Sequence, residues 1–91
     1  MKGMVKRGIQ NGPRIAELLT ADLRAAGLLP TKYRVVSRRI ASGPICVLYL
    51  ACGDEGEGVY VGFDYDTAWR TVEASGAEGI WQAHAGGPDT H

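Results

Sequence analysis

Residues 33–54 read YRVVSRRIASGPICVLYLACGD, and this stretch decides the fold class. In its second half, Ile45 to Cys52, both alternating sets of side chains are apolar, which is typical of a strand buried on both faces. A preceding strand is predicted over Lys32 to Ile40, because β-branched and aromatic residues there favour extended backbone. The arginines of the same segment indicate a solvent-exposed face or edge. Residues 41–44, Ala-Ser-Gly-Pro, form a turn sequence between the two. The stretch therefore predicts two antiparallel strands at its centre.

A third strand is predicted beyond the glycine- and acid-rich loop of residues 53–58, where Val59, Val61 and Phe63 point to one face. Because the connections are short, successive strands should run antiparallel as a meander. A further short strand is expected over residues 80–83, which include Ile80 and Trp81.

Two helices are predicted on either side of the strands. The first begins at Pro13 and ends before Gly27, because apolar residues recur there at spacings of three and four. The second covers Thr67 to Ser75, with Asp66 as its N-terminal cap and Gly76 after its last turn. The side chains expected on the buried faces are Ile15, Leu18, Leu19, Leu23, Ala26, Trp69 and Val72.

These elements predict an α+β fold: an antiparallel three- to four-stranded sheet with an N-terminal helix and a second short helix packed on one side. A chain of 91 residues, 45% hydrophobic and 22% charged, supports one packed core. We expect a flexible arm over residues 1–11, with a short edge strand at Met4 and Val5. A single domain over residues 12–85 and a flexible tail over 86–91 follow.

A cytoplasmic protein is expected, in the host cytoplasm if a phage encodes it. The longest apolar run, residues 45–52, is far shorter than the roughly 20 residues of a membrane-spanning helix. Cys46 and Cys52 are the only cysteines. On one extended strand they would lie on the order of 20 Å apart, which excludes a disulfide between them and indicates buried free thiols.

No cofactor, metal site or catalytic group is predicted, so a non-enzymatic role is expected. The two histidines are His84 and His91, and both cysteines lie in the most apolar segment, where a reactive thiolate is disfavoured. Neither a dinucleotide-binding nor a P-loop glycine motif occurs. Five carboxylates stand in or beside the glycine-rich loop without the ligand order of a calcium loop: Asp54, Glu55, Glu57, Asp64 and Asp66.

The formal charge of zero is unevenly distributed along the chain. Residues 1–50 carry nine Lys or Arg and two Asp or Glu, a net charge of +7, whereas residues 51–91 carry one and eight, a net charge of −7. These charges either form two separate poles on the surface or pair with one another within the fold.

Residues 33–54 and the helix before them resemble small domains associated with the large polyvalent proteins of phages and plasmids. In those domains a helix leads into a charged strand, a Ser-Gly turn, here Ser42-Gly43, and an apolar strand. The chain departs from that pattern at Pro44-Ile45 and over residues 49–54. In size and in lacking catalytic residues it also resembles the anti-CRISPR and other anti-defence proteins of phages. That resemblance implies a protein that acts by occupying a host complex.

Three functions follow as hypotheses. The first is a binding protein that modulates a host protein or ribonucleoprotein through an acidic and aromatic surface formed by Asp54, Glu55, Glu57, Tyr60, Asp64 and Asp66. The second is a nucleic-acid-binding accessory domain in which Tyr33 stacks on a base and phosphates contact Lys32, Arg34, Arg38 and Arg39. The third is a homodimeric module joined through an edge strand, although charged residues on an edge strand also serve to prevent such pairing.

Overall fold

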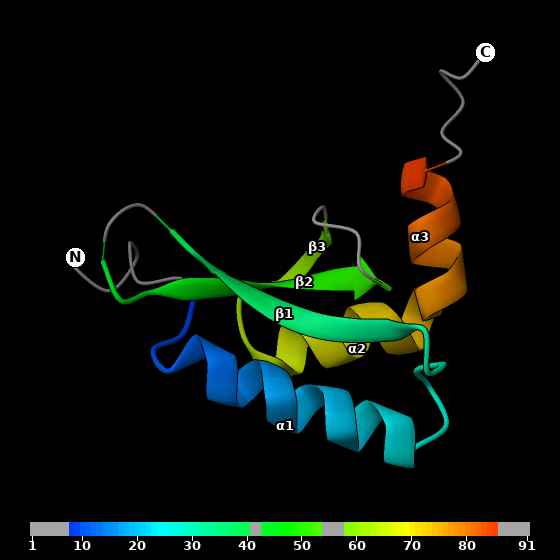
Figure 1. The fold of residues 1–91 in the computed structure, drawn as a ribbon, viewed down its shortest axis with the longest axis horizontal. Coiled ribbons are helices and arrows are strands. Elements are labelled where there is room, and N and C mark those ends of the chain that lie inside the picture. Colours follow the sequence, from blue (N-terminus) through cyan, green and yellow to red (C-terminus); the bar gives the residue numbers. More distant parts are fainter. Residues whose placement is uncertain (1–7, 41–42, 54–57, 86–91) are drawn as a thin grey trace.

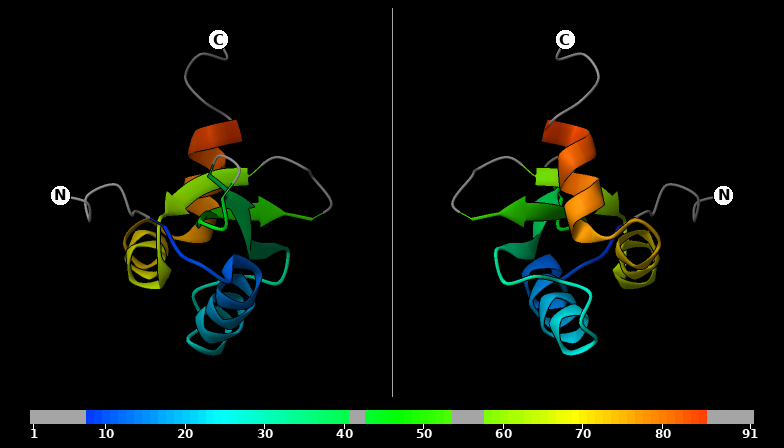
Figure 2. Two further views of the ribbon diagram at one scale, coloured as in Figure 1. Left: turned by 90° about the vertical axis from the view of Figure 1, so that its left-hand side faces the viewer. Right: turned by 90° about the vertical axis from the view of Figure 1, so that its right-hand side faces the viewer.

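The computed structural model describes residues 8–40, 43–53 and 58–85. The elements follow in the order α1 (Gly12–Ala25), β1 (Tyr33–Arg39), β2 (Cys46–Cys52), β3 (Gly58–Gly62), α2 (Tyr65–Ser75) and α3 (Ala77–Ala85). Figure 1 shows one sheet with α1 and α2 packed beneath it, and Figure 2 shows these two helices side by side. The predicted α+β fold with an antiparallel sheet is confirmed.

The strand order β1-β2-β3 places the apolar strand β2 at the centre, as the sequence predicts. β1 and β2 pair without interruption, from Tyr33 opposite Cys52 to Arg39 opposite Cys46. The pairing of β2 with β3 contains a shift, because Leu48 lies opposite Gly62 whereas the next residue of β2 lies opposite Tyr60. A shift of this kind is a β-bulge, which bends the strand locally.

Residues 8–11, which directly precede α1, contact the sheet at Ile9. Ile9 forms an isolated antiparallel bridge to Cys46, with both backbone N–H···O distances below 3 Å, at 2.8 and 2.7 Å. The predicted edge strand at Met4 and Val5 and the predicted tail over residues 86–91 lie outside the described residues.

The core lies between the sheet and the two helices beneath it. Leu19 and Leu23 of α1 and Val72 of α2 are fully buried against Leu48 and Leu50 of β2. At about 25 cal/mol per Å² of apolar surface removed from water, these contacts are the main favourable contribution to folding. The helices therefore cover one face of the sheet.

The buried face of α1 differs from the predicted one at two positions. Leu18 is 42% exposed and Ala26 is exposed, whereas Ala16 is only 4% exposed. Ala16, Leu19 and Leu23 follow one another at spacings of three and four, so they share a stripe that Leu18 does not join. The α2 prediction is closer, since Val72 is fully buried and Trp69 is half-buried.

Helix α2 begins two residues earlier than predicted because its cap is Asp64, not Asp66. The Asp64 carboxylate accepts a hydrogen bond from the Thr67 backbone N–H at 2.9 Å, and the Thr67 hydroxyl accepts one from the Asp64 N–H at 3.1 Å. This reciprocal pair is a capping box, which satisfies two otherwise unpaired donors at the helix start. Asp66 lies within the first turn and is exposed.

The predicted strand over residues 80–83 is wrong, because this segment belongs to helix α3. Gly76 has a backbone φ of +80°, which lets the chain turn sharply between α2 and α3. A segment of four residues is too short to show a helical or strand period, so its packing decides its conformation. Here Ile80 and Trp81 pack against the core. In Figure 1, α3 rises past one end of the sheet toward the face that α1 and α2 leave uncovered.

Candidate functional site

The face of the sheet opposite α1 and α2 carries the candidate site. Side chains on a strand alternate between faces, and residues directly opposite one another share a face. Val36 pairs with Tyr49, and Tyr49 pairs with Tyr60. The strand register then gives the full set that we call the open face: Arg34, Val36, Arg38, Val47, Tyr49, Ala51 and Tyr60.

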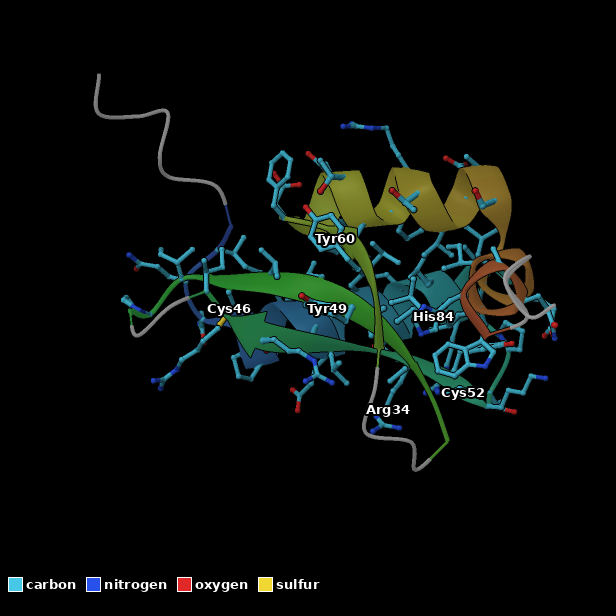
Figure 3. All side chains as sticks on the ribbon, turned by 90° about the horizontal axis from the view of Figure 1, so that it is seen from above. Arg34, Cys46, Tyr49, Cys52, Tyr60 and His84 are labelled. Carbon is cyan, nitrogen blue, oxygen red and sulfur yellow. The ribbon has the colours of Figure 1, made fainter. Side chains whose placement is uncertain are left out.

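Two tyrosines lie beside one another at the centre of the open face (Figure 3). The ring centroids of Tyr49 and Tyr60 are 5.9 Å apart at an interplanar angle of 76°, an edge-to-face arrangement that aromatic pairs prefer. Tyr49 is half-buried, whereas Tyr60 is 51% exposed. The pair therefore presents ordered aromatic surface to solvent.

Two arginines of β1 lie on the same face of the sheet as these tyrosines. The Arg38 guanidinium carbon lies 5.3 Å from the centroid of the Tyr49 ring, within the range of a cation–π interaction. Arg34 donates a hydrogen bond from Nη1 to the backbone oxygen of Gly53, just after β2. Both arginine side chains are exposed. The open face is thus a surface of tyrosine and arginine.

Sequence reasoning missed Tyr49, because β2 is predicted to be buried on both faces. In the structure Leu48 and Leu50 are fully buried, but Val47 and Tyr49 are only half-buried. The prediction of two buried faces is therefore wrong at Val47 and Tyr49, whereas Ala51, farther along the same face, is only 2% exposed. The sequence feature that could have revealed this is the tyrosine itself, because its hydroxyl favours a partly solvent-exposed position within an otherwise apolar strand.

Tyr33 does not form the base-stacking residue that the sequence suggests. It lies on the covered face, is 1% exposed and packs on Trp81 of α3, with ring centroids 6.2 Å apart. Its hydroxyl donates to Glu78 Oε1 at 2.8 Å. Burial, together with this bond to a carboxylate, raises the pKa of Tyr33 to about 12. Tyr33 therefore anchors α3 to the sheet.

The other residues of the predicted basic set occupy different positions. Lys32 forms a salt bridge with Glu78, 3.3 Å from Nζ to Oε1, and its Nζ lies 5.3 Å from the centroid of the Tyr33 ring. Arg39 is exposed at the end of β1 and, by register, lies on the same side of the sheet as Tyr33. Of the four predicted residues, Arg34 and Arg38 are thus the two that the fold brings together on the open face.

The predicted acidic and aromatic surface is brought together only in part. Tyr60 is exposed on β3, whereas the carboxylate of Asp64 is engaged in the helix cap. Asp66 is exposed on α2, one of the two helices beneath the sheet. The remaining three acids, Asp54, Glu55 and Glu57, lie outside the described residues.

The outer edge of β1 is largely occupied by side chains of α1. The Thr20 hydroxyl accepts a hydrogen bond from the Val35 N–H at 2.9 Å, and Arg24 Nη2 donates to the Tyr33 backbone oxygen at 2.7 Å. A homodimer that added a strand along this part of β1 would have to displace both. Beside this edge, a groove of about 590 Å³ runs between α1 and β1, lined by residues that include Glu17 and Ser37.

Three further properties concern the described residues. Both cysteines are free thiols: Cys46 is buried as predicted, and Cys52 is half-buried. Across the described ranges, no three His, Cys, Asp or Glu side chains lie together as a metal-binding group. In the same part of the chain, no helix has the length and apolar character needed to cross a membrane.

Comparisons with known proteins give no relative on which to base a function. No model of a protein family, no curated protein and no solved structure significantly matches this chain.

Proposed function

We propose that this chain is a non-enzymatic binding protein that presents its open face to a macromolecular partner and modulates that partner by occupying it. The observation that carries the proposal is the exposed ring of Tyr60, held edge-on against Tyr49 on the face that α1 and α2 leave uncovered. Tyrosine and arginine are both enriched at the centres of binding interfaces. Tyrosine combines a large contact area with few rotatable bonds, so it loses little entropy when it is buried.

The position of the tyrosines supports recognition rather than packing within the domain. Leu48 and Leu50 on the covered face already provide buried contacts with the helices. Tyr49 is held by Arg38 on one side and Tyr60 on another, so its ring is ordered before any partner arrives. Order in the free protein reduces the entropy lost on binding.

The predicted partner class, a host protein or ribonucleoprotein complex, remains part of this proposal. The proposed site, however, is the open face and not the predicted acidic and aromatic surface, and Tyr60 belongs to both. The charged loop gives a discriminating test, since replacing Asp54→Asn, Glu55→Gln and Glu57→Gln together removes three negative charges. If the acids contact a basic partner, this variant should bind more weakly and with less salt sensitivity. If the arginines of the open face contact an anionic partner, the variant should bind at least as tightly.

The direct experiment is affinity capture from a host lysate with quantitative mass spectrometry. We expect the double variant Tyr49→Ala, Tyr60→Ala to lose at least about nine-tenths of the captured partner, as loss of two aromatic anchors implies. Arg70→Ala is the matched control, because Arg70 is exposed on α2, beneath the sheet. Equal capture by the double variant and the wild type, with both shown to be folded by circular dichroism, would exclude the open face as the binding surface.

A further inference from the structure

We infer that the open face binds single-stranded nucleic acid, with unpaired bases stacking on Tyr60 and Tyr49 and with phosphates contacting Arg34 and Arg38. This inference rests on the proposed function, because it names the partner of the same surface.

The aromatic geometry fits bases that are not paired in a duplex. Tyr60 and Tyr49 stand on neighbouring strands with ring centroids 5.9 Å apart, and half of Tyr60 is accessible, at 51%. An open sheet face with aromatic rings on adjacent strands is a surface on which splayed bases stack. Bases inside a duplex already stack on one another, so rings fixed on a sheet cannot reach their faces. The geometry therefore favours single strands.

The charge of the sheet supports an anionic ligand although the whole chain is neutral. β1 contains Arg34, Arg38 and Arg39, and none of the three strands contains an aspartate or glutamate. Two of these arginines, Arg34 and Arg38, lie on the open face, and Arg38 contacts the Tyr49 ring. Arginine side chains attract phosphates through short-range contacts even where the net charge of the chain is zero, because screening limits the effect of distant charges.

The arginines are spaced to follow a nucleic acid backbone. Arg34 and Arg38 are four residues apart on one strand, so their Cα atoms are separated by about 13 Å at roughly 3.3 Å per residue. Val36 lies between them, opposite Tyr49. A strand of a few nucleotides that passes along β1 would thus contact an arginine near each end while its bases point over β2 and β3.

The test measures direct binding of fluorescein-labelled oligonucleotides by fluorescence anisotropy. The probes are a single-stranded DNA of mixed sequence, the matching RNA, and a DNA duplex of equal length, each at low salt and at about 200 mM salt. We expect the wild type to bind one or both single strands more tightly than the duplex, with affinity that falls as salt rises. Equal or tighter binding of the duplex, or no binding of any probe at low salt, would overturn the inference.

Variants then assign the binding to the open face. Tyr60→Ala alone should weaken single-strand binding by roughly 5- to 150-fold, the range expected for loss of one stacking contact. Because Tyr60 is exposed, this substitution leaves the core intact, so it remains informative if the double tyrosine variant does not fold. Arg34→Ala with Arg38→Ala should weaken binding and flatten its salt dependence. Arg70→Ala, which removes one positive charge from α2, should do neither, and equal effects from Arg70→Ala would contradict the inference.

Nuclease treatment of the lysate before affinity capture distinguishes a failure of this inference from a failure of the proposed function. If treatment of the lysate with nuclease leaves capture unchanged, capture still depends on Tyr49 and Tyr60, and no oligonucleotide binds, then the open face recognises a protein. In that case the proposed function stands and the nucleic acid inference is wrong. If the double tyrosine variant captures as much partner as the wild type and the oligonucleotides do not bind, both are wrong.

Discussion

The two faces of one small sheet differ in nearly every property although they are built from the same strands. On the covered face, Val35, Leu48 and Leu50 are at most 4% exposed and lie against α1 and α2. On the open face, Tyr49 is half-buried and Tyr60 is 51% exposed. Because neighbouring residues on a strand point in opposite directions, Leu48 stabilises the fold while the next residue is available for binding. Stability and recognition should therefore be separable by mutation.

The largest effect should come from truncating the covered face. Leu50→Ala should lower the free energy of unfolding by about 2–5 kcal/mol, because it removes buried methyl groups and leaves a cavity between the sheet and the helices. Tyr60→Ala should change it by less than about 1 kcal/mol, since the side chain is half exposed. Urea unfolding followed by circular dichroism measures both. A larger cost for Tyr60→Ala than for Leu50→Ala would contradict the separation of the two faces.

The next effect concerns the contact of α2 with the end of β3. A Cβ atom on Gly62 would lie 2.5 Å from the Ala68 backbone nitrogen and would also overlap the Thr67 hydroxyl. Gly62→Ala should therefore cost about 1–3 kcal/mol of unfolding free energy, because helix and strand must separate.

Gly79→Ala in α3 is the matched control for this substitution, since a Cβ there meets no atom within 4 Å. It should be neutral or stabilise the protein by up to about 1 kcal/mol, because alanine favours helix more than glycine does. Thermal or urea unfolding of both variants gives the comparison. Equal costs at the two positions would show that α2 does not pack closely on β3.

A smaller effect should follow from removing the cap of α2, a helix that covers the core. Asp64→Ala should lower the unfolding free energy by about 0.5–2 kcal/mol, because the Thr67 N–H loses its acceptor. Asp66→Ala should cost less, since Asp66 lies in the first turn and contributes only a favourable interaction with the helix dipole. The two single variants, compared by urea unfolding, distinguish the observed cap from the predicted one.

The last effect is absent at neutral pH and appears only above pH 10: a pH dependence that marks tyrosines held within the fold. Burial and the bond to Glu78 raise the pKa of Tyr33 to about 12, and the bond to Asp22 followed by burial raises the pKa of Tyr65 to about 12. The usual value is near 10. Because each pKa is higher in the folded state, each tyrosine contributes fully to the free energy of unfolding below pH 10. This contribution is lost as the pH rises from 10 to 12, because the tyrosine ionises first in the unfolded state.

Ultraviolet absorbance of tyrosinate and urea unfolding between pH 9 and 12 test this prediction together. Tyr33→Phe and Tyr65→Phe should each remove one group that ionises near pH 12. Each should also make unfolding free energy less sensitive to pH between about 10 and 12. If the group lost in each variant ionised near pH 10 instead, the hydrogen bonds from Tyr33 to Glu78 and from Tyr65 to Asp22, which are 2.8 and 2.5 Å long, would be contradicted.

The elements with a clear period could be predicted from the sequence. Apolar residues recur at spacings of three and four through α1, and they are uninterrupted in β2. Few conformations other than a helix and a buried strand, respectively, would bury these two patterns. The turn sequence before Cys46 adds the antiparallel connection. Segment 80–83 had no such signal, because four residues, three of them apolar, are too few to distinguish a helix from a strand. The predicted cap of α2, Asp66, was wrong because Asp64 and Asp66 are chemically the same and only backbone geometry selects between them.

The candidate site could be predicted only in fragments. Arg34, Arg38 and Tyr60 stand out in the sequence, but nothing there places them on one face with Tyr49. That grouping depends on the register of β2 against β1 and on the bulge at Leu48, since a shift of one residue would move every side chain to the opposite face.

By itself, the sequence determined an α+β chain with one amphipathic helix and a central apolar strand, because these follow from periodicity within each segment. Only the tertiary structure decided which face the helices cover, that Tyr33 anchors α3, and that the rings of Tyr49 and Tyr60 contact each other on the uncovered face. The physical reason is that local periodicity specifies which side chains share a face, whereas strand register and helix packing specify what that face contacts.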